Sequence, residues 1–207
     1  PDSVKAALEK ALSTNDVIVT TGGISTGKND LVMQVLEEDF DAFVHFGRVN
    51  MKPGSFTAFA TFSYNGKHKM VFALPGDPVS CCVTSLLFMI PALRYMERSK
   101  IYKFPVAPVM AMLGKENANK RPEYHGLAVT IDYKKKYSLV GTSTRNQISS
   151  RINSLADANG LAIVNTDTEA IFVEQYEVIL FDDLIYTDTE AIFVEQYEVI
   201  LFDDLIS

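Results

Sequence analysis

The sequence predicts an α/β sheet subdomain in residues 1–100, followed by a small all-β subdomain in residues 101–207. The first half alternates apolar positions at helical spacing with short runs of β-branched and aromatic residues, which is typical of helices packed on a sheet. After Lys100 the sequence changes to short strand-like runs separated by polar turns, and this favours an all-β subdomain. With 207 residues, 47% of them hydrophobic, the chain can bury a sizeable core.

The elements of the first half are expected in a regular order. An amphipathic helix at 3–14 leads to a strand at 16–20, and a glycine loop then precedes a helix that Asn29 can cap. The remaining expected elements are a strand at 42–49, a hairpin of 56–63 with 69–73 that turns at Asn65-Gly66, and a long apolar helix at 78–98.

The second half begins with a proline-containing linker at 102–108. Its expected strands are 106–113, 127–133, 137–141 and 161–164. Residues 166–185 then recur without change at 187–206. Two identical copies differ from a diverged repeat architecture, so a recent tandem duplication or an error in the assembled sequence explains them better.

Each copy of this duplication predicts a hairpin of 170–173 with 178–181, or the equivalent residues of the second copy. Since two identical hairpins cannot occupy one sheet edge, we expect one copy to be surplus, mobile or paired with another chain. Each copy also carries six acidic and no basic residues. Most of the net charge of −7 therefore comes from the duplication.

Several classes of protein are disfavoured by composition. No basic patch interleaves with the aromatic residues, which argues against a nucleic-acid partner. No continuous apolar run reaches about 18 residues, and the N-terminal residues lack the pattern of a signal peptide, so we expect no membrane span and a cytoplasmic location. Cys81 and Cys82 are adjacent in an apolar helical stretch, which favours buried reduced thiols over a disulfide or a metal site.

The glycine loop is the first candidate binding site, and its residues are Gly22, Gly23, Ser25 and Gly27. Glycines let backbone N–H groups approach an anion closely, so phosphate binding is physically natural here. A tight turn between strand and helix without a ligand explains the loop equally well. Asp30 in the following helix is a candidate Mg²⁺ ligand, with a favourable interaction with the helix dipole as the alternative.

Two further segments carry candidate residues. Arg48 and Lys52 are separated by an even number of positions, so on one strand they would share a face and hold a polyanion between them; solvated strand charges are the alternative. Pro75, Gly76 and Asp77 form a turn before the long helix, and a structural helix cap explains this turn equally well.

The order of these segments resembles the MoeA/gephyrin family of molybdopterin molybdenumtransferases. The resemblance rests on TTGGISTGKND, HFGRVNMKPG, FALPGDPVS, RPEYHG and NQISSRINSLADANGL, and it covers residues 1 to about 165, closest to the gephyrin-like eukaryotic branch. It implies a MogA-like molybdopterin-binding α/β subdomain followed by a C-terminal β-barrel. It also implies that molybdate replaces the adenylate of adenylated molybdopterin, giving molybdenum cofactor and AMP with Mg²⁺.

The resemblance assigns roles to individual residues. The glycine loop with Ser25 would cradle phosphates, Asp30 would hold the divalent cation, and Arg48 with Lys52 would form an anion clamp. Ser149, Ser150 and Arg151 match a family stretch that faces the same cleft. Asp77 departs from the family's usual asparagine and places an anionic group beside the presumed phosphate site, while Lys28 replaces a common glutamate and partly offsets this charge.

Partners and alternatives follow from the same resemblance. It implies a longer homodimeric protein in which N-terminal subdomains complete the cleft, so the 207 residues alone are not expected to be fully active. A gephyrin-like scaffold, which clusters receptors and ties them to the cytoskeleton without required catalysis, is the alternative function. A stand-alone molybdopterin adenylyltransferase is disfavoured because such a protein lacks the second, all-β half.

Overall fold

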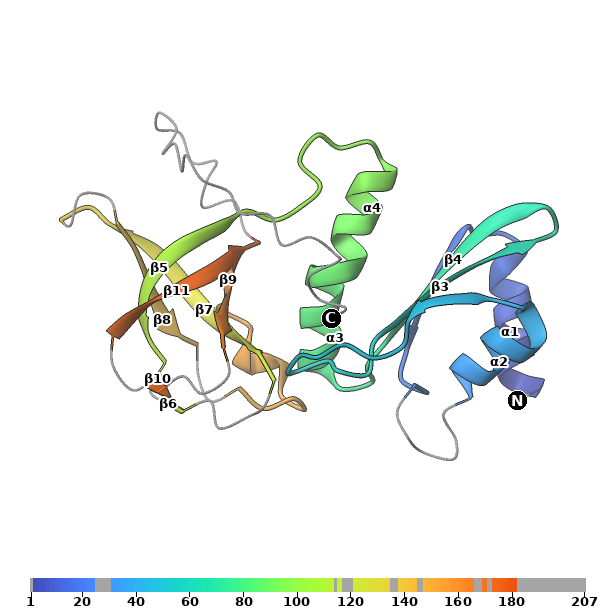
Figure 1. The fold of residues 1–207 in the computed structure, drawn as a ribbon, viewed down its shortest axis with the longest axis horizontal. Coiled ribbons are helices and arrows are strands. Elements are labelled where there is room, and N and C mark those ends of the chain that lie inside the picture. The colour runs from blue at the N-terminus through green and yellow to red at the C-terminus, as the bar shows by residue number, and fades with distance from the viewer. Residues whose placement is uncertain are drawn as a thin grey trace.

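An open four-stranded sheet forms the first half of the protein (Figure 1). Its strands are β1 Val17–Thr21, β2 Phe43–Phe46, β3 Ala58–Tyr64 and β4 Lys67–Leu74, in the order β1-β4-β3-β2. β1 is parallel to β4, whereas β3 is antiparallel to both β4 and β2. The computed structural model describes residues 2–24, 31–113, 115–116, 121–134, 138–144, 147–165, 169–170 and 173–181.

The tight turn between β3 and β4 confirms the predicted hairpin. Asn65 has φ 51° and Gly66 has φ 75°, so both central residues of the turn lie in the left-handed region. A two-residue turn of this kind matches the right-handed twist of the flanking strands, and Asn-Gly is the sequence that tolerates it best. The local sequence therefore determines the register of β3 against β4.

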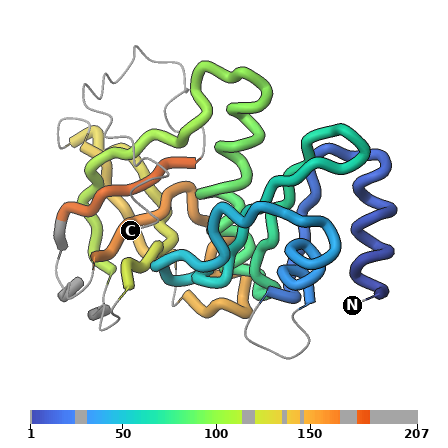
Figure 2. The backbone as a smooth tube through the Cα atoms, turned by 45° about the vertical axis from the view of Figure 1, so that its right-hand side comes forward, coloured from blue at the N-terminus to red at the C-terminus, as the bar shows by residue number. Residues whose placement is uncertain are grey.

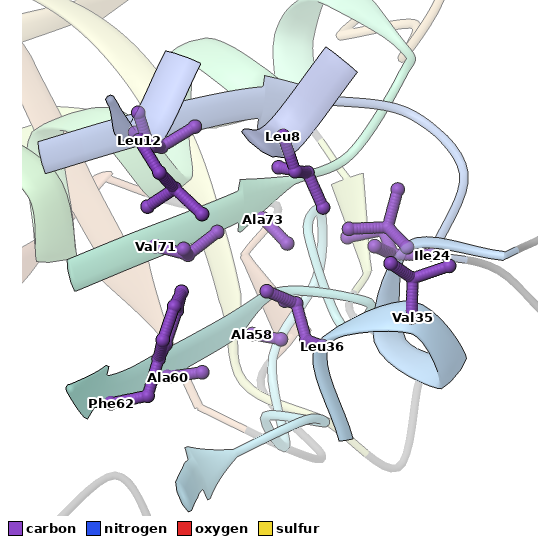
Figure 3. Packing of buried hydrophobic residues seen from close by; sticks show 12 residues of the cluster. Leu8, Leu12, Ile24, Val35, Leu36, Ala58, Ala60, Phe62, Val71 and Ala73 are labelled. Atoms are coloured by element: carbon purple, nitrogen blue, oxygen red, sulfur yellow. The ribbon is translucent and has the colours of Figure 1, made fainter. Parts of the chain in front are cut away.

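Helices α1 Asp2–Leu12 and α2 Val32–Phe40 cover one face of this sheet. Leu8 and Leu12 of α1, with Val35 and Leu36 of α2, pack against alternate residues of β3 and β4 (Figure 3). The alternation arises because successive side chains of a strand point to opposite faces. Full burial of each leucine contributes about 1.5–3 kcal/mol, so this core holds both helices in place.

A continuous helical segment runs from Pro78 to Met96 and comprises α3 Pro78–Thr84, the π-helical η1 Ser85–Met89 and α4 Ile90–Met96. It is 19 residues long with a mean hydropathy of 1.6, which is long and apolar enough to cross a membrane by length and composition alone. A single helix of this kind is weak evidence for a membrane span, because buried core helices pass the same test, and the absence of a span stays a prediction. Val79, Val83 and Phe88 of this helix are buried in a core that the two halves share, so the helix has a packing role within the protein.

The second half is a closed five-stranded barrel in the order β11-β5-β8-β7-β9. Its strands are β5 Val106–Met112, β7 Glu123–Asp132, β8 Ser138–Ser143, β9 Gly160–Val164 and β11 Val173–Leu180. A separate small sheet pairs β6 Lys115–Glu116 with β10 Glu169–Ala170. The expected fold class, an α/β sheet followed by a small β-barrel, is confirmed.

The hairpin predicted for the first copy of the duplication is wrong. Residues 173–180 form the single strand β11, which pairs antiparallel with β5 on one side and with β9 on the other. Closing the barrel requires a strand with partners on both edges, and this pairing prevails over a local turn. The second copy, residues 187–206, lies outside the described residues.

A shared core joins the two halves. Its members come from the end of the first sheet, from the helix 78–96 and from the barrel: Phe46, Val49, Met51, Val79, Val83, Phe88, Tyr124, Leu155, Leu161 and Ile179. Figure 2 shows this helix, in green, between the open sheet and the barrel. The helix therefore serves as the packing centre on which segments from both halves meet.

Candidate functional site

Two turns lie side by side at the carboxyl ends of β1 and β4. The register of these parallel strands ends with Thr21 beside Leu74, and the Gly22 N–H donates a hydrogen bond to the Leu74 carbonyl at 2.9 Å. Loops at the carboxyl ends of parallel strands commonly form the binding crevices of α/β proteins. The predicted glycine loop and the predicted turn 75–77 are thus brought together.

The glycines of these turns permit an unusually close approach of two backbones. Gly22 and Gly23 have φ values of 82° and 72°, a region that favours glycine. A Cβ placed on Gly76 would lie 3.2 Å from the Gly22 Cα atom. Ser25, Gly27 and Asp30 lie outside the described residues, so only the first part of the predicted phosphate loop belongs to the described site.

Asp77 caps the helix that follows the second turn. Its carboxylate accepts a hydrogen bond from the Ser80 N–H at 3.0 Å, and Pro78 occupies the beginning of the helix. Proline is favoured at this position because its missing N–H would have no helical partner. The cap that the sequence offered as one explanation of the turn is present. Pro75, which precedes it, is buried.

A loop of the barrel half reaches the same end of α3. The Val79 N–H donates a hydrogen bond to the Ser149 carbonyl at 3.0 Å. The Arg151 carbonyl accepts hydrogen bonds from the Ser154 N–H at 3.0 Å and from the Ser154 hydroxyl at 2.7 Å. Ser149, Ser150 and Arg151 are all exposed. Backbone contacts therefore hold this loop beside the turn at Gly76 and leave its side chains accessible.

Arg48 and Lys52 do not lie on a strand, which corrects the arrangement assumed for the clamp. β2 ends at Phe46, after a register irregularity in its pairing with β3. The exposed Arg48 places its guanidinium over the Phe56 ring, with the Arg48 Cζ atom 5.2 Å from the ring centroid. The two cations are therefore arranged by an irregular segment and not by the two-residue period of a strand.

This irregular segment packs on α3. Gly54 has φ 95°, and a Cβ at this position would overlap the Thr84 methyl group. The Gly54 carbonyl accepts a hydrogen bond from the Thr57 hydroxyl at 2.7 Å, and the Thr84 hydroxyl donates to the Ser80 carbonyl at 2.8 Å. Three segments thus contact α3: the turn at Gly76, the loop at Ser149 and the irregular segment that carries Arg48 and Lys52.

Sequence reasoning missed the partner of Lys52. The Lys52 ammonium lies 3.2 Å from a carboxylate oxygen of Glu123, which is 4% exposed. Glu123 belongs to β7 in the barrel. Its segment, RPEYHG, contributed only to the family resemblance. An acidic residue between Pro122 and an apolar strand is a weak sign of a buried carboxylate. No local pattern connects it with Lys52.

Comparisons with known proteins match two separate regions of the chain. Residues 1–95 match the family model of a probable molybdopterin binding domain, and residues 115–179 match that of the MoeA C-terminal region (domain IV). A solved structure of the molybdopterin biosynthesis moeA protein from Pyrococcus horikoshii OT3 has a TM-score of 0.53 and 21% identity, covering 87% of this chain and 39% of that one. This likeness supports the fold alone.

Relatives with higher identity come from eukaryotes and bacteria. Gephyrin of Dictyostelium discoideum is 35% identical over 79% of this chain and 25% of its own length. The molybdenum cofactor synthesis protein cinnamon of Drosophila melanogaster is 35% identical over 76% and 25%, and a molybdopterin molybdenumtransferase of Bacillus subtilis is 29% identical over 79% and 36%. The chain thus spans between a quarter and about a third of these relatives.

The fold and the matched regions define a molybdopterin-binding α/β domain joined to a MoeA-type C-terminal barrel. The chain belongs to the MoeA/gephyrin family of molybdenum cofactor biosynthesis proteins, which includes the molybdopterin molybdenumtransferases.

Proposed function

We propose that this chain provides the cleft in which molybdenum is inserted into adenylated molybdopterin, with molybdenum cofactor and AMP as products. The observation that carries the proposal is the convergence of three segments on the short helix α3. The turns at Gly22 and Gly76 meet there, the Ser149 carbonyl binds the Val79 N–H, and the segment with Arg48 and Lys52 packs on the same helix. Residues from both halves are therefore within one region.

The chemistry of the proposed reaction requires cations. A phosphoanhydride bond is broken and molybdate is an oxyanion, so negative charge accumulates on oxygen atoms at the reacting centre. Arg48 and Lys52 would attract these oxygens, and preorganised cations stabilise such charge more effectively than water does. Accessible backbone at Gly22 and Gly76 and the hydroxyls of Ser149 and Ser150 would bind the remaining phosphate oxygens.

Mg²⁺ is proposed as the divalent ion, with Asp30 as its protein ligand. Proteins usually bind Mg²⁺ through one or two carboxylates together with substrate phosphates and waters. Within the described ranges no three potential metal-ligating side chains lie together, so the described residues supply no all-protein cage. One carboxylate and the substrate's own oxygens fit this donor set. When bound, the ion would act as a Lewis acid on the phosphate oxygens.

The test is molybdate-dependent release of AMP from adenylated molybdopterin in the presence of Mg²⁺, using the natural full-length protein. Asp30→Asn, Arg48→Met and Lys52→Met should each lower the rate by at least about tenfold, as loss of one charge-stabilising donor commonly does. Lys5→Met is the matched control, because Lys5 forms an exposed ion pair with Asp39 in the first half. This variant should keep the wild-type rate.

A folded protein that binds molybdopterin and releases no AMP would favour the alternative, a gephyrin-like clustering scaffold. Receptor or cytoskeletal partners, the homodimer and the cytoplasmic location stay predictions of the family resemblance.

A further inference from the structure

Lys52 and Glu123 form an ion pair with unequal exposure. The Lys52 ammonium and the Glu123 carboxylate are 3.2 Å apart, and their side chains are 44% and 5% exposed. A carboxylate with so little access to water requires compensating partners, because desolvation of a charge is costly. The partly exposed lysine, in contrast, still faces the solvent from which an anion would arrive.

The backbone fixes this pair independently of the side chains. The Lys52 N–H donates to the Pro122 carbonyl at 2.9 Å, and the Tyr124 N–H donates to the Lys52 carbonyl at 2.8 Å. These two bonds form a parallel bridge between Lys52 and Glu123. An ordinary surface ion pair loses much of its stabilising free energy through the entropy of ordering two long side chains. Here the backbone bridge already fixes the Cα atoms from which both side chains extend.

A buried histidine of the barrel lies on the far side of the carboxylate. The second oxygen of Glu123 lies 3.8 Å from His125 Nδ1, and His125 is 2% exposed. The other ring nitrogen, His125 Nε2, shares a hydrogen bond of 2.8 Å with the Ser143 hydroxyl. The imidazole is therefore fixed inside the barrel, and Glu123 lies between it and Lys52.

We propose that Glu123 is a positioning residue, which holds the Lys52 ammonium so that it binds the substrate's anionic oxygens in one orientation. An ammonium group has three N–H donors, and one directed at Glu123 leaves two for an oxyanion. This inference rests on the proposed function and deepens it. The first half supplies the cation, and the barrel supplies the carboxylate that orients it.

The proposal separates binding from turnover. Glu123→Gln keeps the size of the side chain and one acceptor oxygen, but it removes the negative charge. The Lys52 ammonium is then held less firmly, and a neighbouring carboxylate no longer offsets its attraction for an anion. We expect kcat to fall about tenfold, since small misplacements of a reacting group are costly, while KM stays unchanged or falls. Glu123→Asp keeps the charge on a shorter side chain and should recover part of this loss. A role in packing alone predicts the opposite order, because aspartate fills less space than glutamine.

The experiment is a double-mutant cycle on the natural full-length protein: wild type, Lys52→Met, Glu123→Gln and the double variant. If Glu123 acts through Lys52, Glu123→Gln lowers kcat in the wild type and has no further effect in the Lys52→Met background. Multiplicative effects of the two substitutions would overturn the proposal. An Asp39→Asn control, which changes the exposed pair with Lys5, should leave kcat and KM unchanged.

A second measurement on the same variants keeps this inference distinct from the proposed reaction. Calorimetric titration with pyrophosphate requires no turnover. We expect Glu123→Gln to tighten pyrophosphate binding at least about twofold when Lys52 is present and to leave it unchanged in the Lys52→Met background, because the substitution acts through the Lys52 ammonium. Equal effects in both backgrounds would contradict the positioning role. A wild type that binds pyrophosphate through Lys52 and releases no AMP would contradict only the proposed reaction.

Discussion

Gly22 and Gly76, which are far apart in sequence, face each other across the ends of two parallel strands with no side chain between them. A Cβ on Gly76 would lie 3.2 Å from the Gly22 Cα atom and 3.7 Å from its nitrogen. Contacts this short with backbone cannot be relieved by a rotamer change. The geometry of the glycine turn therefore depends on the absence of a side chain at position 76.

Gly76→Ala should separate the two turns. We expect the free energy of unfolding to fall by about 1–2 kcal/mol, within the range of substitutions that force packed backbone to move, and pyrophosphate binding to weaken. Gly66→Ala is a matched control, because Gly66 has φ 75° but no atom within 4 Å of the added Cβ. That variant should lose stability through strain and keep its affinity. Chemical denaturation measures stability and calorimetry measures pyrophosphate binding. Unaltered binding in Gly76→Ala would show that the anion site does not depend on the absence of a side chain at position 76.

Asp77 combines a helix cap with a negative charge beside the proposed phosphate site, and two substitutions separate these properties. Asp77→Ala removes the acceptor for the Ser80 N–H and should cost about 1 kcal/mol of stability. Asp77→Asn keeps an equally good cap and should leave stability nearly unchanged. Both variants should bind pyrophosphate more tightly. Weaker binding in Asp77→Asn would show that the carboxylate contributes to the site.

Stability at acid pH should depend on Asp16. Lys69, which is 2% exposed, donates hydrogen bonds to the Asp16 carboxylate at 2.8 Å and to the Asn15 carbonyl at 2.7 Å. The hydrogen bond and the charge of Lys69 lower the pKa of Asp16 from its usual 3.8. A lowered folded-state pKa gives stability that is present above the unfolded-state value and is lost as pH falls through the folded-state value.

Asp16→Asn should therefore flatten the fall in melting temperature below about pH 4. Lys69→Met should flatten it similarly, because the cause of the pKa shift is removed. Thermal melts from pH 6 to pH 2 measure this dependence. If the melting temperature of Asp16→Asn fell with decreasing pH as steeply as that of the wild type, the role assigned to Asp16 would be contradicted.

Stability at alkaline pH should depend on Tyr124 at the junction of the two halves. Tyr124 is 2% exposed, and burial raises its pKa from 10.0 to about 12. Between these values the unfolded chain loses a proton that the folded protein keeps, so the free energy of unfolding falls as pH rises. Tyr124→Phe should reduce this fall, whereas Tyr133→Phe at a 72% exposed tyrosine should not. Melting temperatures from about pH 9 to pH 11.5 check the difference.

The sequence predicted elements well where the controlling interactions are local. The Asn65-Gly66 turn, the apolar stripe of α1 and the glycine turn after β1 each depend on residues only a few positions apart. The end of β2 was not predictable in this way. Its strand-like residues continue to Val49, but the chain departs from the sheet after Phe46 because Val49 and Met51 enter the core shared with the barrel.

The site followed the same pattern. Candidate anion-binding residues could be selected by type, since glycines and cations are recognisable along the chain. Their arrangement could not, because the bridge from Lys52 to Glu123 and the bond from Val79 to Ser149 join residues about 70 positions apart. Such contacts depend on how the two halves pack, and no local period or motif encodes that packing.

The shared core has a consequence for how the proposed site would respond to a ligand. Docking of the barrel on the helix 78–96 buries apolar side chains from both halves, and the same docking brings Ser149 to α3 and Glu123 to Lys52. Separation of the halves would take the proposed anion site apart, so a ligand that binds only the docked state would stabilise it by RT ln(1 + L/Kd), where L is the concentration of free ligand. The affinity for the ligand and the free energy of docking between the two halves are then thermodynamically linked, so each can be measured through the other.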